Sequence, residues 1–598
     1  MWAVLPALVT SLWRDALIAE RVQISVIKVA VWGYSYRKAD ERRVLTQAWQ
    51  LSLVVLLCAC GVSAQNSVVQ GLVTDPSQAV VGGAQVTVAN TGTGRMYKVV
   101  TNGDGHYAVP FLTAGTYRVT AMREGFAPAV REGVRLEVQQ VARVDLMLAL
   151  GAVSETVEVA DGRIPMESAV AQMGQVIENR VVAGMPLNGR NYLELAPLAG
   201  GTLPAAVMGV GARTGATGGF TAMGSQAYQT TISVDGVDNT PIPTGGAQGQ
   251  VAQATTPSLD SVSEFRVVTN NYSAEHGFRM GPHVFVSLKS GTNRFRGSLY
   301  EYVRNDRFDA ANFFANRSGA AKPAYRQNQF GGTFGGPLRP ERTFFFASYE
   351  GTRIRQGTPR LTTVPSALAK SGDFSKERAN LNRIFDPAST IGSGVDASRQ
   401  PFPGQLAPPS RWDPVSQRLL GLFPASNVAG REYDPFNYFS APVTRVGVNQ
   451  IDYRIDHAAG ERDKFYLSHS ISRNVTVTPP PLPVVAGSDG GQSFHLPAQN
   501  LGFAWIRAIR PSLYNEARFG YLRFHTLRDT LITEPLNAAF GIEGAPGDAF
   551  GDGGNKGFTH FQISGYTNLG TPCCEPNFND TDSYQFYNNV VMQAGGSR

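Results

Sequence analysis

The chain has 598 residues, which is too long for one ordinary domain, and it contains 64 glycines and 36 prolines with only 17% charged residues. This composition favours many strands and turns over helical bundles. The net charge of +6 comes from 53 Lys and Arg against 47 Asp and Glu. Because the positive residues are scattered and form no block, they indicate a solvated surface and argue against a nucleic-acid groove.

Residues 1–64 are predicted to be a leader that ends in a secretory signal peptide. The run LSLVVLLCACGVSAQ (51–65) has an apolar core that is too short to cross a bilayer as a helix. Arg42 and Arg43 precede it, and small residues before Gln65 offer a cleavage site. This layout predicts export from the cytoplasm.

The four cysteines leave two questions open. A lipoprotein signal with Cys60 as the lipidated residue is the alternative to ordinary cleavage. Cys573 and Cys574 are adjacent, which is too close for a zinc site, and they pair either with each other or with nothing. Residues 1–41 are unusual for a leader, and we expect a true start codon further downstream; N-terminal sequencing that found residues before Gln65 in the mature protein would refute this.

Residues 65–150 read as a compact β-sandwich. Seven short apolar or alternating runs are separated by turn signals such as Asn102-Gly-Asp-Gly105. In one run, Tyr117 and Val119 share a face, while Arg118 and Thr120 share the other. The Asn102–Gly105 run has too few carboxylates for a calcium loop, so it is interpreted as a tight turn.

A connector at 151–168 follows. Its segment Glu155, Thr156, Val157, Glu158, Val159 is extended in character, has β-branched residues and contains no proline. Such a segment suits strand addition to the sheet of another protein. The alternative is that it forms the last strand of the sandwich or a plain linker.

Residues 169–291 are rich in glycine and other small residues, which predicts a small α+β domain. The stretch 176–198 is expected to hold one or two short helices, and TTISVDGVDN (230–239) is expected to be a strand that enters a turn at Asp235-Gly236. The polar loops around Arg190 and around Asp235, Asp238 and Asn239 could face a ligand. The alternative is that these residues only form turns.

From residue 292 to 598 the pattern changes to long alternating strands. Ile451, Tyr453 and Ile455 share one face of a strand, and the intervening charged residues share the other face. A turn follows at 458–463. In a soluble sandwich the apolar face would meet another sheet, whereas in an outer-membrane barrel it meets lipid and the polar face lines the lumen.

Long polar stretches at about 357–447 and 474–498 interrupt these strands. Loops of this length are rare in compact soluble domains. They are typical of the extracellular side of transporter barrels, where the opposite turns are short. The pattern therefore favours the membrane barrel.

Three sequence blocks resemble the plug-to-barrel junction of Oar-like TonB-dependent outer-membrane receptors. They are NGRNY (188–192), VDGVDNT (234–240) and the long run 273–306. Residues 71–88 and NGDGHY (102–107) are similar to a carboxypeptidase regulatory-like, or transthyretin-like, domain. The resemblance covers roughly 66–598, and several separated blocks occur in the right order.

The resemblance implies an all-β-dominated protein in the cell outer membrane: a leader and signal peptide (1–64), a sandwich (65–150), a linker (151–168), a plug (169–291) and the N-terminal part of a barrel (292–598). Glu155 to Val159 then look like a TonB box, which meets a TonB-type periplasmic coupling protein. The implied function is TonB-dependent uptake of a small ligand through an outer membrane whose lipid surrounds the barrel, with no cofactor, metal or nucleic acid. Carbohydrate or peptide products are favoured, while siderophores and cobalamin stay open.

One departure from the family is large. A plugged transporter barrel has about 22 strands, whereas the alternation pattern after residue 293 supports only about eight to ten. Half a barrel would expose unpaired strand edges, which a bilayer does not tolerate. We therefore expect this sequence to be a C-terminally truncated fragment that does not transport by itself.

Two rival functions compete with transport. A surface adhesion or binding protein without transport predicts further sandwich repeats, and no second copy of the 66–150 pattern occurs. An enzyme is disfavoured because the eight histidines show no HExxH spacing and no G-x-S-x-G lies between a strand and a helix. No catalytic residue is therefore predicted.

Overall fold

The structure is a computed structural model, and it describes residues 67–151, 157–158, 173–185, 187, 189–204, 220–226, 229–241, 253–272, 279–311, 313–318, 322–378, 383–483, 491–534, 536–542, 557–571 and 576–592. The proposed signal peptide, all four cysteines, and Glu155, Thr156 and Val159 lie outside these residues. In the described part, no helix combines the length and the apolar character needed to span a membrane.

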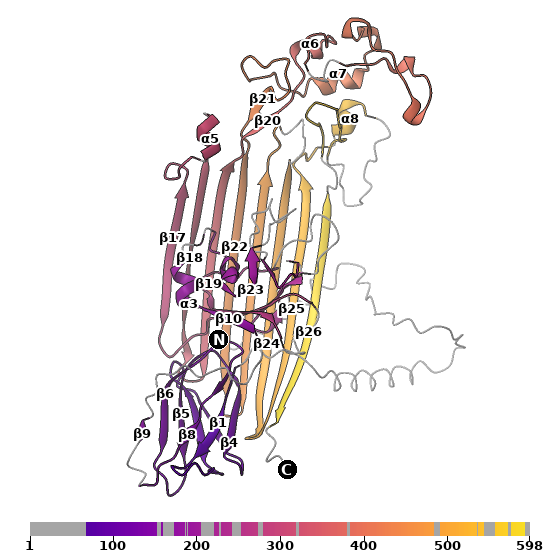
Figure 1. The fold of residues 1–598 in the computed structure, drawn as a ribbon. Coiled ribbons are helices and arrows are strands. Elements are labelled where there is room, and N and C mark those ends of the chain that lie inside the picture. The colour runs from indigo at the N-terminus through magenta and orange to yellow at the C-terminus, as the bar shows by residue number, and fades with distance from the viewer. Residues whose placement is uncertain are drawn as a thin grey trace, which may run out of the picture. The chain divides into compact units, whose positions relative to one another are not determined.

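The first domain consists of two facing sheets, as its strand pattern predicted (Figure 1). One sheet has the order β4-β1-β7 with β8 also paired to β1, and the other has the order β3-β2-β5-β6-β9. The strands are β1 (Ser67–Thr74), β2 (Gln85–Asn90), β3 (Met96–Val100), β4 (His106–Leu112), β5 (Gly115–Met122), β6 (Ala129–Leu136), β7 (Val141–Arg143), β8 (Leu146–Met147) and β9 (Val157–Glu158). The part of the chain from Ser67 to Met147 thus holds eight strands, one more than the seven predicted runs.

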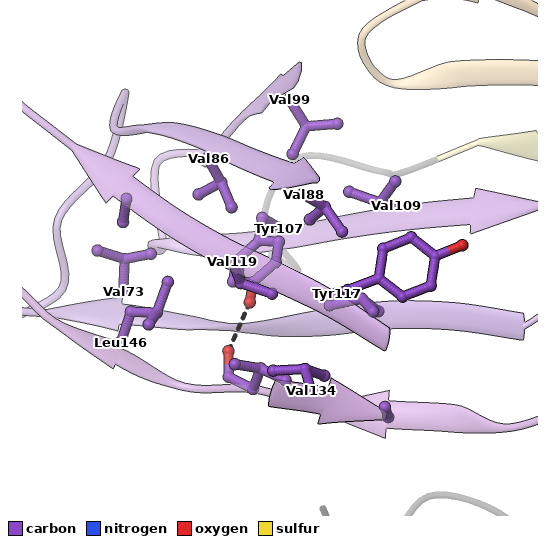
Figure 2. Packing of buried hydrophobic residues seen from close by; sticks show 14 of the residues in the cluster. Val73, Val86, Val88, Val99, Tyr107, Val109, Tyr117, Val119, Val134 and Leu146 are labelled. Carbon is purple, nitrogen blue, oxygen red and sulfur yellow. Dashed lines mark hydrogen bonds between the residues drawn. The ribbon is translucent and has the colours of Figure 1, made fainter. Parts of the chain in front are cut away.

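Valines and two tyrosines fill the space between these sheets (Figure 2). Tyr117 and Val119 are buried while Arg118 between them is exposed, as the alternation predicted. The buried Tyr107 hydroxyl donates to the Val144 carbonyl at 2.6 Å. The predicted tight turn is also present, because Asn102 Oδ1 accepts from His106 N at 2.8 Å and Gly105 has a φ of 75°.

The second domain is built around a mixed sheet with the order β10-β15-β16-β13-β14. Its strands are β10 (Met173–Glu178), β13 (Thr231–Val234), β14 (Val237–Asp238), β15 (Val262–Asn270) and β16 (His283–Leu288), and a separate hairpin joins β11 (Thr202–Pro204) to β12 (Phe220–Ala222). The helix α3 (Asn179–Gly184) and the 3-10 helix η2 (Tyr192–Leu198) are the two predicted short helices. We call this domain the plug.

The third part is one antiparallel sheet in which each strand pairs with the next long strand (Figure 1). Its eight described strands are β17 (Arg296–Asn305), β18 (Tyr325–Arg339), β19 (Thr343–Gly357), β22 (Val443–Ala459), β23 (Asp463–Thr478), β24 (Gln492–Arg510), β25 (Leu513–Thr530) and β26 (Asn577–Met592). The turn predicted at 458–463 joins β22 to β23. We call this sheet the wall.

The two faces of the wall differ in the way the alternation predicted. On β22, Asp452 is fully buried, whereas the apolar side chains of Ile451 and Ile455 are 42% and 36% exposed. A soluble sheet buries its apolar face, so an exposed apolar face and a covered polar face are typical of a strand between lipid and lumen. The plug lies against the polar face, as the ion pairs described below show.

One predicted loop is wrong in its bounds. Both ends of the stretch 474–498 are strand, because β23 continues to Thr478 and β24 begins at Gln492. Phe494, Leu496 and Ala498 alternate along β24 and are buried. The prolines of this segment suggested a loop, but Pro497 lies inside β24, where the β24–β25 register skips from His495 to Ala498.

The other long stretch does connect two wall strands, and it is folded. Between β19 and β22 it holds the two-stranded sheet of β20 (Arg360–Thr362) and β21 (Tyr438–Ser440), and between these strands lie the helices α6 (Ala367–Lys370) and α7 (Pro414–Leu420). An apolar cluster joins this loop to the segment after β25, through the buried residues Val364, Leu419, Phe423, Leu482, Ile532, Phe558 and Leu569. We call this assembly the loop cap.

The buried side-chain amide of Asn437 links two segments of the loop cap by hydrogen bonds. Asn437 is fully buried; its Oδ1 accepts from Val364 N at 2.8 Å, and its Nδ2 donates to the carbonyls of Val364 and Glu432 at 2.9 and 3.0 Å. We expect Asn437→Ala to destabilise the cap by about 1–3 kcal/mol, because it leaves buried backbone groups unpaired.

Asn427 offers a matched control for this substitution. It makes the same two-bond pairing with the backbone of Phe439, but it is exposed, so water can replace its side chain. Protease sensitivity of the cap on intact cells should therefore rise strongly for Asn437→Ala and little for Asn427→Ala. Equal sensitivity of the two variants would contradict the role given to Asn437.

Candidate functional site

The candidate functional site is the contact between the plug and the wall, where the predicted site residues lie. Asp235, at the tip of the β13–β14 hairpin, is 4% exposed, and its Oδ1 lies 2.8 Å from Arg454 Nη1 on β22. The same oxygen accepts from the plug's own Leu288 N at 3.1 Å. Tyr466 of β23 donates its hydroxyl to the Asp235 backbone carbonyl at 2.9 Å. The hairpin tip is thus tied to two neighbouring wall strands.

The Asp235 carboxylate is held in a poorly solvated place. Burial raises the pKa of this carboxyl above its ordinary value, and the Arg454 guanidinium opposes that shift. Its other oxygen, Oδ2, has no hydrogen-bond partner in the described part of the chain. Arg454 also binds Asp456 at 2.9 Å, and Asp456 accepts from Ser290 of the plug at 2.6 Å. The ion pair is therefore one part of a network across the contact.

Arg190 forms a second anchor, on the first strands of the wall. It is 9% exposed, its Nη2 lies 2.5 Å from Asp260 of the plug, and its Nε lies 3.3 Å from Glu350 of β19. The guanidinium carbon lies 4.6 and 4.4 Å from the ring centroids of Tyr300 and Tyr302 on β17. This geometry combines a charge-assisted pair with two cation–π contacts. Burial acts to lower the pKa of Arg190, but Glu350 and Asp260 raise it above its ordinary value.

A third anchor uses a buried wall carboxylate and a plug serine. Asp452 Oδ2 accepts from Ser258 N at 3.0 Å and from the Ser348 hydroxyl at 3.2 Å. The hydroxyls of Ser258 and Ser348 are 2.8 Å apart. Four strands of the wall, β17, β19, β22 and β23, thus contribute charged or aromatic side chains that hold the plug.

Asn239 and Asp238 complete the hairpin. Asn239 is fully buried and pairs with both the N–H and the carbonyl of Thr255 inside the plug, at 3.1 and 2.7 Å. Asn500 of β24 donates to the Asp238 carbonyl at 3.1 Å. The half-buried Asp238 accepts from Thr240 N at 2.9 Å. The hairpin is therefore braced from the plug side and from the wall side.

The four residues predicted to face a ligand all lie in this contact. Arg190, Asp235 and Asn239 direct their polar atoms to the wall or to the plug itself, and Asp238 does so through its backbone and Thr240. Their role in ligand binding stays a prediction. Sequence reasoning did not find their partners on the wall, although it did recognise that Asp452, Arg454 and Asp456 share the polar face of one strand.

The TonB-box-like segment is described only at β9. Val157 and Glu158 pair in parallel with Ala129 and Val130 of β6. β9 is the last strand of this sandwich sheet in the part of the chain that is described. This pairing agrees with the alternative interpretation, in which the segment is the last strand of the sandwich. The other edge of β9 pairs with no strand in the described part of the chain.

The sandwich contacts the plug through the buried carboxylate of Glu264. Glu264 of β15 accepts a hydrogen bond from Val138 N in the loop between β6 and β7. Val138 packs in an apolar cluster with Val268 and Phe285 of the plug. Arg135 of β6 also pairs with Glu178 of β10 at 3.0 Å. We call this contact the sandwich–plug joint.

No metal site emerges from the described residues, where no group of three or more His, Cys, Asp or Glu could hold an ion. The charged residues of the site are instead paired across the contact between plug and wall. This arrangement holds the plug against the wall.

Two family models match the chain. An outer membrane beta barrel domain matches residues 287–597, which is more than half of the chain, and a carboxypeptidase regulatory-like domain matches residues 68–149. Among curated proteins, the TonB-dependent transporter Oar of Myxococcus xanthus is 25% identical over 320 residues, which cover 51% of this chain and 29% of Oar. The chain thus spans less than a third of the length of this curated relative.

Among solved structures, the outer membrane transporter YddB from Escherichia coli is similar at 10% identity and a TM-score of 0.43, over 70% of this chain and 45% of YddB. The siderophore receptor PirA from Acinetobacter baumannii is similar at 13% identity and a TM-score of 0.34, over 60% of this chain and 40% of PirA. Given the matched barrel model, the chain belongs to the outer-membrane β-barrel domain family, and it is an outer-membrane protein with a carboxypeptidase regulatory-like domain before its plug and wall.

Proposed function

We propose that this chain is part of a TonB-dependent transporter that takes up a small ligand across the outer membrane. The observation that carries the proposal is the plug, which is bound to the polar face of the wall by buried ion pairs such as Asp235–Arg454. A pore filled by such a domain conducts only if an energised partner displaces it. The similarity to the transporter Oar supports the same function.

The partner in this proposal is a TonB-type periplasmic coupling protein that binds the segment Glu155 to Val159. Strand addition needs a free edge and unobstructed backbone N–H groups. β9 supplies an edge of the sandwich sheet, next to the joint that connects the sandwich to the plug. A force that the coupling protein applies to this segment would therefore reach the plug through β6 and the sandwich–plug joint.

The ligand class is proposed on weaker grounds, from the habit of the resembled family and the appended sandwich. Carbohydrate or peptide breakdown products are the first candidates. Cells that produce the full-length receptor should be supplied in parallel with maltooligosaccharides, oligopeptides, a ferric siderophore and cobalamin. Accumulation of an oligosaccharide or peptide is expected, and saturable tight binding of the siderophore would overturn this ligand class.

A proline at Val157 separates transport from simple surface binding. Val157→Pro removes an N–H from β9 and prevents regular strand pairing, so we expect loss of energised uptake with surface binding of the ligand retained. Val157→Ile keeps a β-branched side chain and is the matched control. If Val157→Pro transports normally, the segment is not the coupling site; if neither variant nor the parent transports any probe although binding persists, the surface-binding alternative holds.

A further inference from the structure

The β13–β14 hairpin of the plug ends in a tight turn, and the residues of this turn contact the wall. Asp235 and Gly236 both have positive φ, 46° and 82°, and Val234 pairs with Val237 across the turn. Turns of this kind match the twist of a two-residue hairpin. The side chain of Val237 follows the turn directly, at the place where β14 packs on β24 and β25.

On the wall, five residues that pair with one another form a row beneath this tip. Strand pairing places Arg454, Ser468, Gly502, Gly520 and Gln585 side by side across β22, β23, β24, β25 and β26. Two of these residues, Gly502 and Gly520, have no side chain. In a strand interior a glycine often marks the close approach of another backbone or group.

Val237 occupies the space that these two glycines leave. A Cβ added to Gly502 would lie 2.9 Å from Val237 Cγ2, and a Cβ added to Gly520 would lie 2.7 Å from Val237 Cγ1. Both distances are below those of ordinary carbon contacts, so a side chain at either position would displace Val237. We call the gap between Gly502 and Gly520 the glycine socket.

The ends of the row bind the residues on either side of Val237. Arg454 pairs with Asp235 at 2.8 Å. Gln585 accepts from Asp238 N at 2.9 Å and donates to the Asp238 carbonyl at 3.2 Å. One row of the wall therefore contacts the hairpin three times, in the order of its sequence.

Gly236 explains why the tip can approach so closely. A Cβ on Gly236 would lie 1.4 Å from Arg518 Nη1, so the Arg518 guanidinium occupies the side-chain position of this glycine. Arg518 is held there by Glu516 at 2.6 Å. Close approach thus depends on glycines on both sides of the contact.

We propose that Gly502 and Gly520 form a shape-specific seat for Val237, and that this seat sets the closed position of the plug. The ion pair at Asp235 supplies attraction, whereas the socket fixes the register of the hairpin along the row. The inference deepens the proposed function, since a plug must leave this seat when the pore opens. The seat itself is testable without any ligand or coupling protein.

The test fills the socket and then restores the fit. The full-length receptor carrying Gly520→Val is expected to let a large antibiotic, vancomycin, enter cells, because overpacking of this kind shifts a seated-to-unseated ratio by roughly 5- to 150-fold. Adding Val237→Gly to Gly520→Val should lower the entry again. Gly447→Val is the matched control on β22, since a Cβ there meets no atom within 4 Å.

Several outcomes would overturn the proposal that Gly502 and Gly520 seat Val237. One is an entry rate for Gly520→Val equal to that of Gly447→Val, and another is a double variant as leaky as Gly520→Val. If Gly520→Val does not reach the membrane, Val237→Lys changes only the plug and places a cation beside Arg518. Normal antibiotic exclusion by Val237→Lys would then also overturn the proposal.

Discussion

Replacing Arg454 with alanine is expected to release the hairpin tip of the plug from the wall. The substitution leaves the Asp235 carboxylate buried and without its ion-pair partner, and it also removes the cation bound to Asp456. Breaking a buried ion pair from one side costs about 3–5 kcal/mol, because a charge then stays in a poorly solvated place. Trypsin digestion of outer-membrane vesicles should cleave the plug much faster in this variant.

Two further variants test whether faster digestion is caused by loss of the Asp235–Arg454 ion pair. Arg473 lies on the wall strand β23, which is joined by a turn to β22 that carries Arg454, and its side chain is exposed. The plug of the Arg473→Ala variant should therefore be digested at the rate of the parent. Replacing both partners, as Arg454→Met with Asp235→Asn, should restore much of the protection, because the buried carboxylate is then gone while asparagine tolerates the positive φ and still accepts from Leu288 N. Equal digestion of Arg454→Ala and Arg473→Ala would show that the ion pair does not hold the plug.

The faces of the wall strands were predictable from the sequence because side chains alternate with a period of two. This rule placed Ile451, Tyr453 and Ile455 on one face and Asp452, Arg454 and Asp456 on the other. The same rule applied to residues 492–498 would have extended β24, but the prolines obscured it. A proline is tolerated there because the pairing with β25 is interrupted at that point.

The contacts of the candidate site were not predictable in the same way. The turn at Asp235-Gly236 follows from local conformational preferences, and it was predicted correctly. The ion pair between Asp235 and Arg454 joins residues that are 219 positions apart. No sequence pattern near either residue indicates such a long-range contact. A polar turn that faces water and one that faces a polar wall have the same composition.

Two glycines of the wall do carry a signal of this contact in the sequence. Gly502 and Gly520 interrupt strands that are otherwise rich in large side chains, and an isolated glycine within a strand indicates close approach of another part of the chain. The alternation places both glycines on the polar face, together with Asn500 and Arg518. Glycines on that face, taken together with the alternation, indicate a docking surface on β24 and β25.

The sandwich–plug joint is expected to weaken as the pH rises. Burial raises the pKa of Glu264 from 4.5 to about 7; the Val138 N–H and Arg135 oppose this shift, while Glu137 and Glu178 add to it. A solvated glutamate loses its proton near pH 4.5, so between that pH and about 7 only the docked state keeps the proton. Docking is therefore most favourable at low pH, and it weakens by about 3 kcal/mol as the pH rises from about 4.5 to about 7, above which it no longer changes.

Hydrogen exchange of the full chain around residues 137–140, corrected for the intrinsic rate, measures this joint directly. Protection should be higher at pH 5 than at pH 8 in the parent and should become independent of pH in Glu264→Gln, which stays neutral and still accepts the bond from Val138. Glu124→Gln changes an exposed glutamate of the same sandwich and should keep the parent's pH dependence. If Glu264→Gln also keeps it, another group controls the joint, and the protonation of Glu264 has no part in coupling the sandwich to the plug.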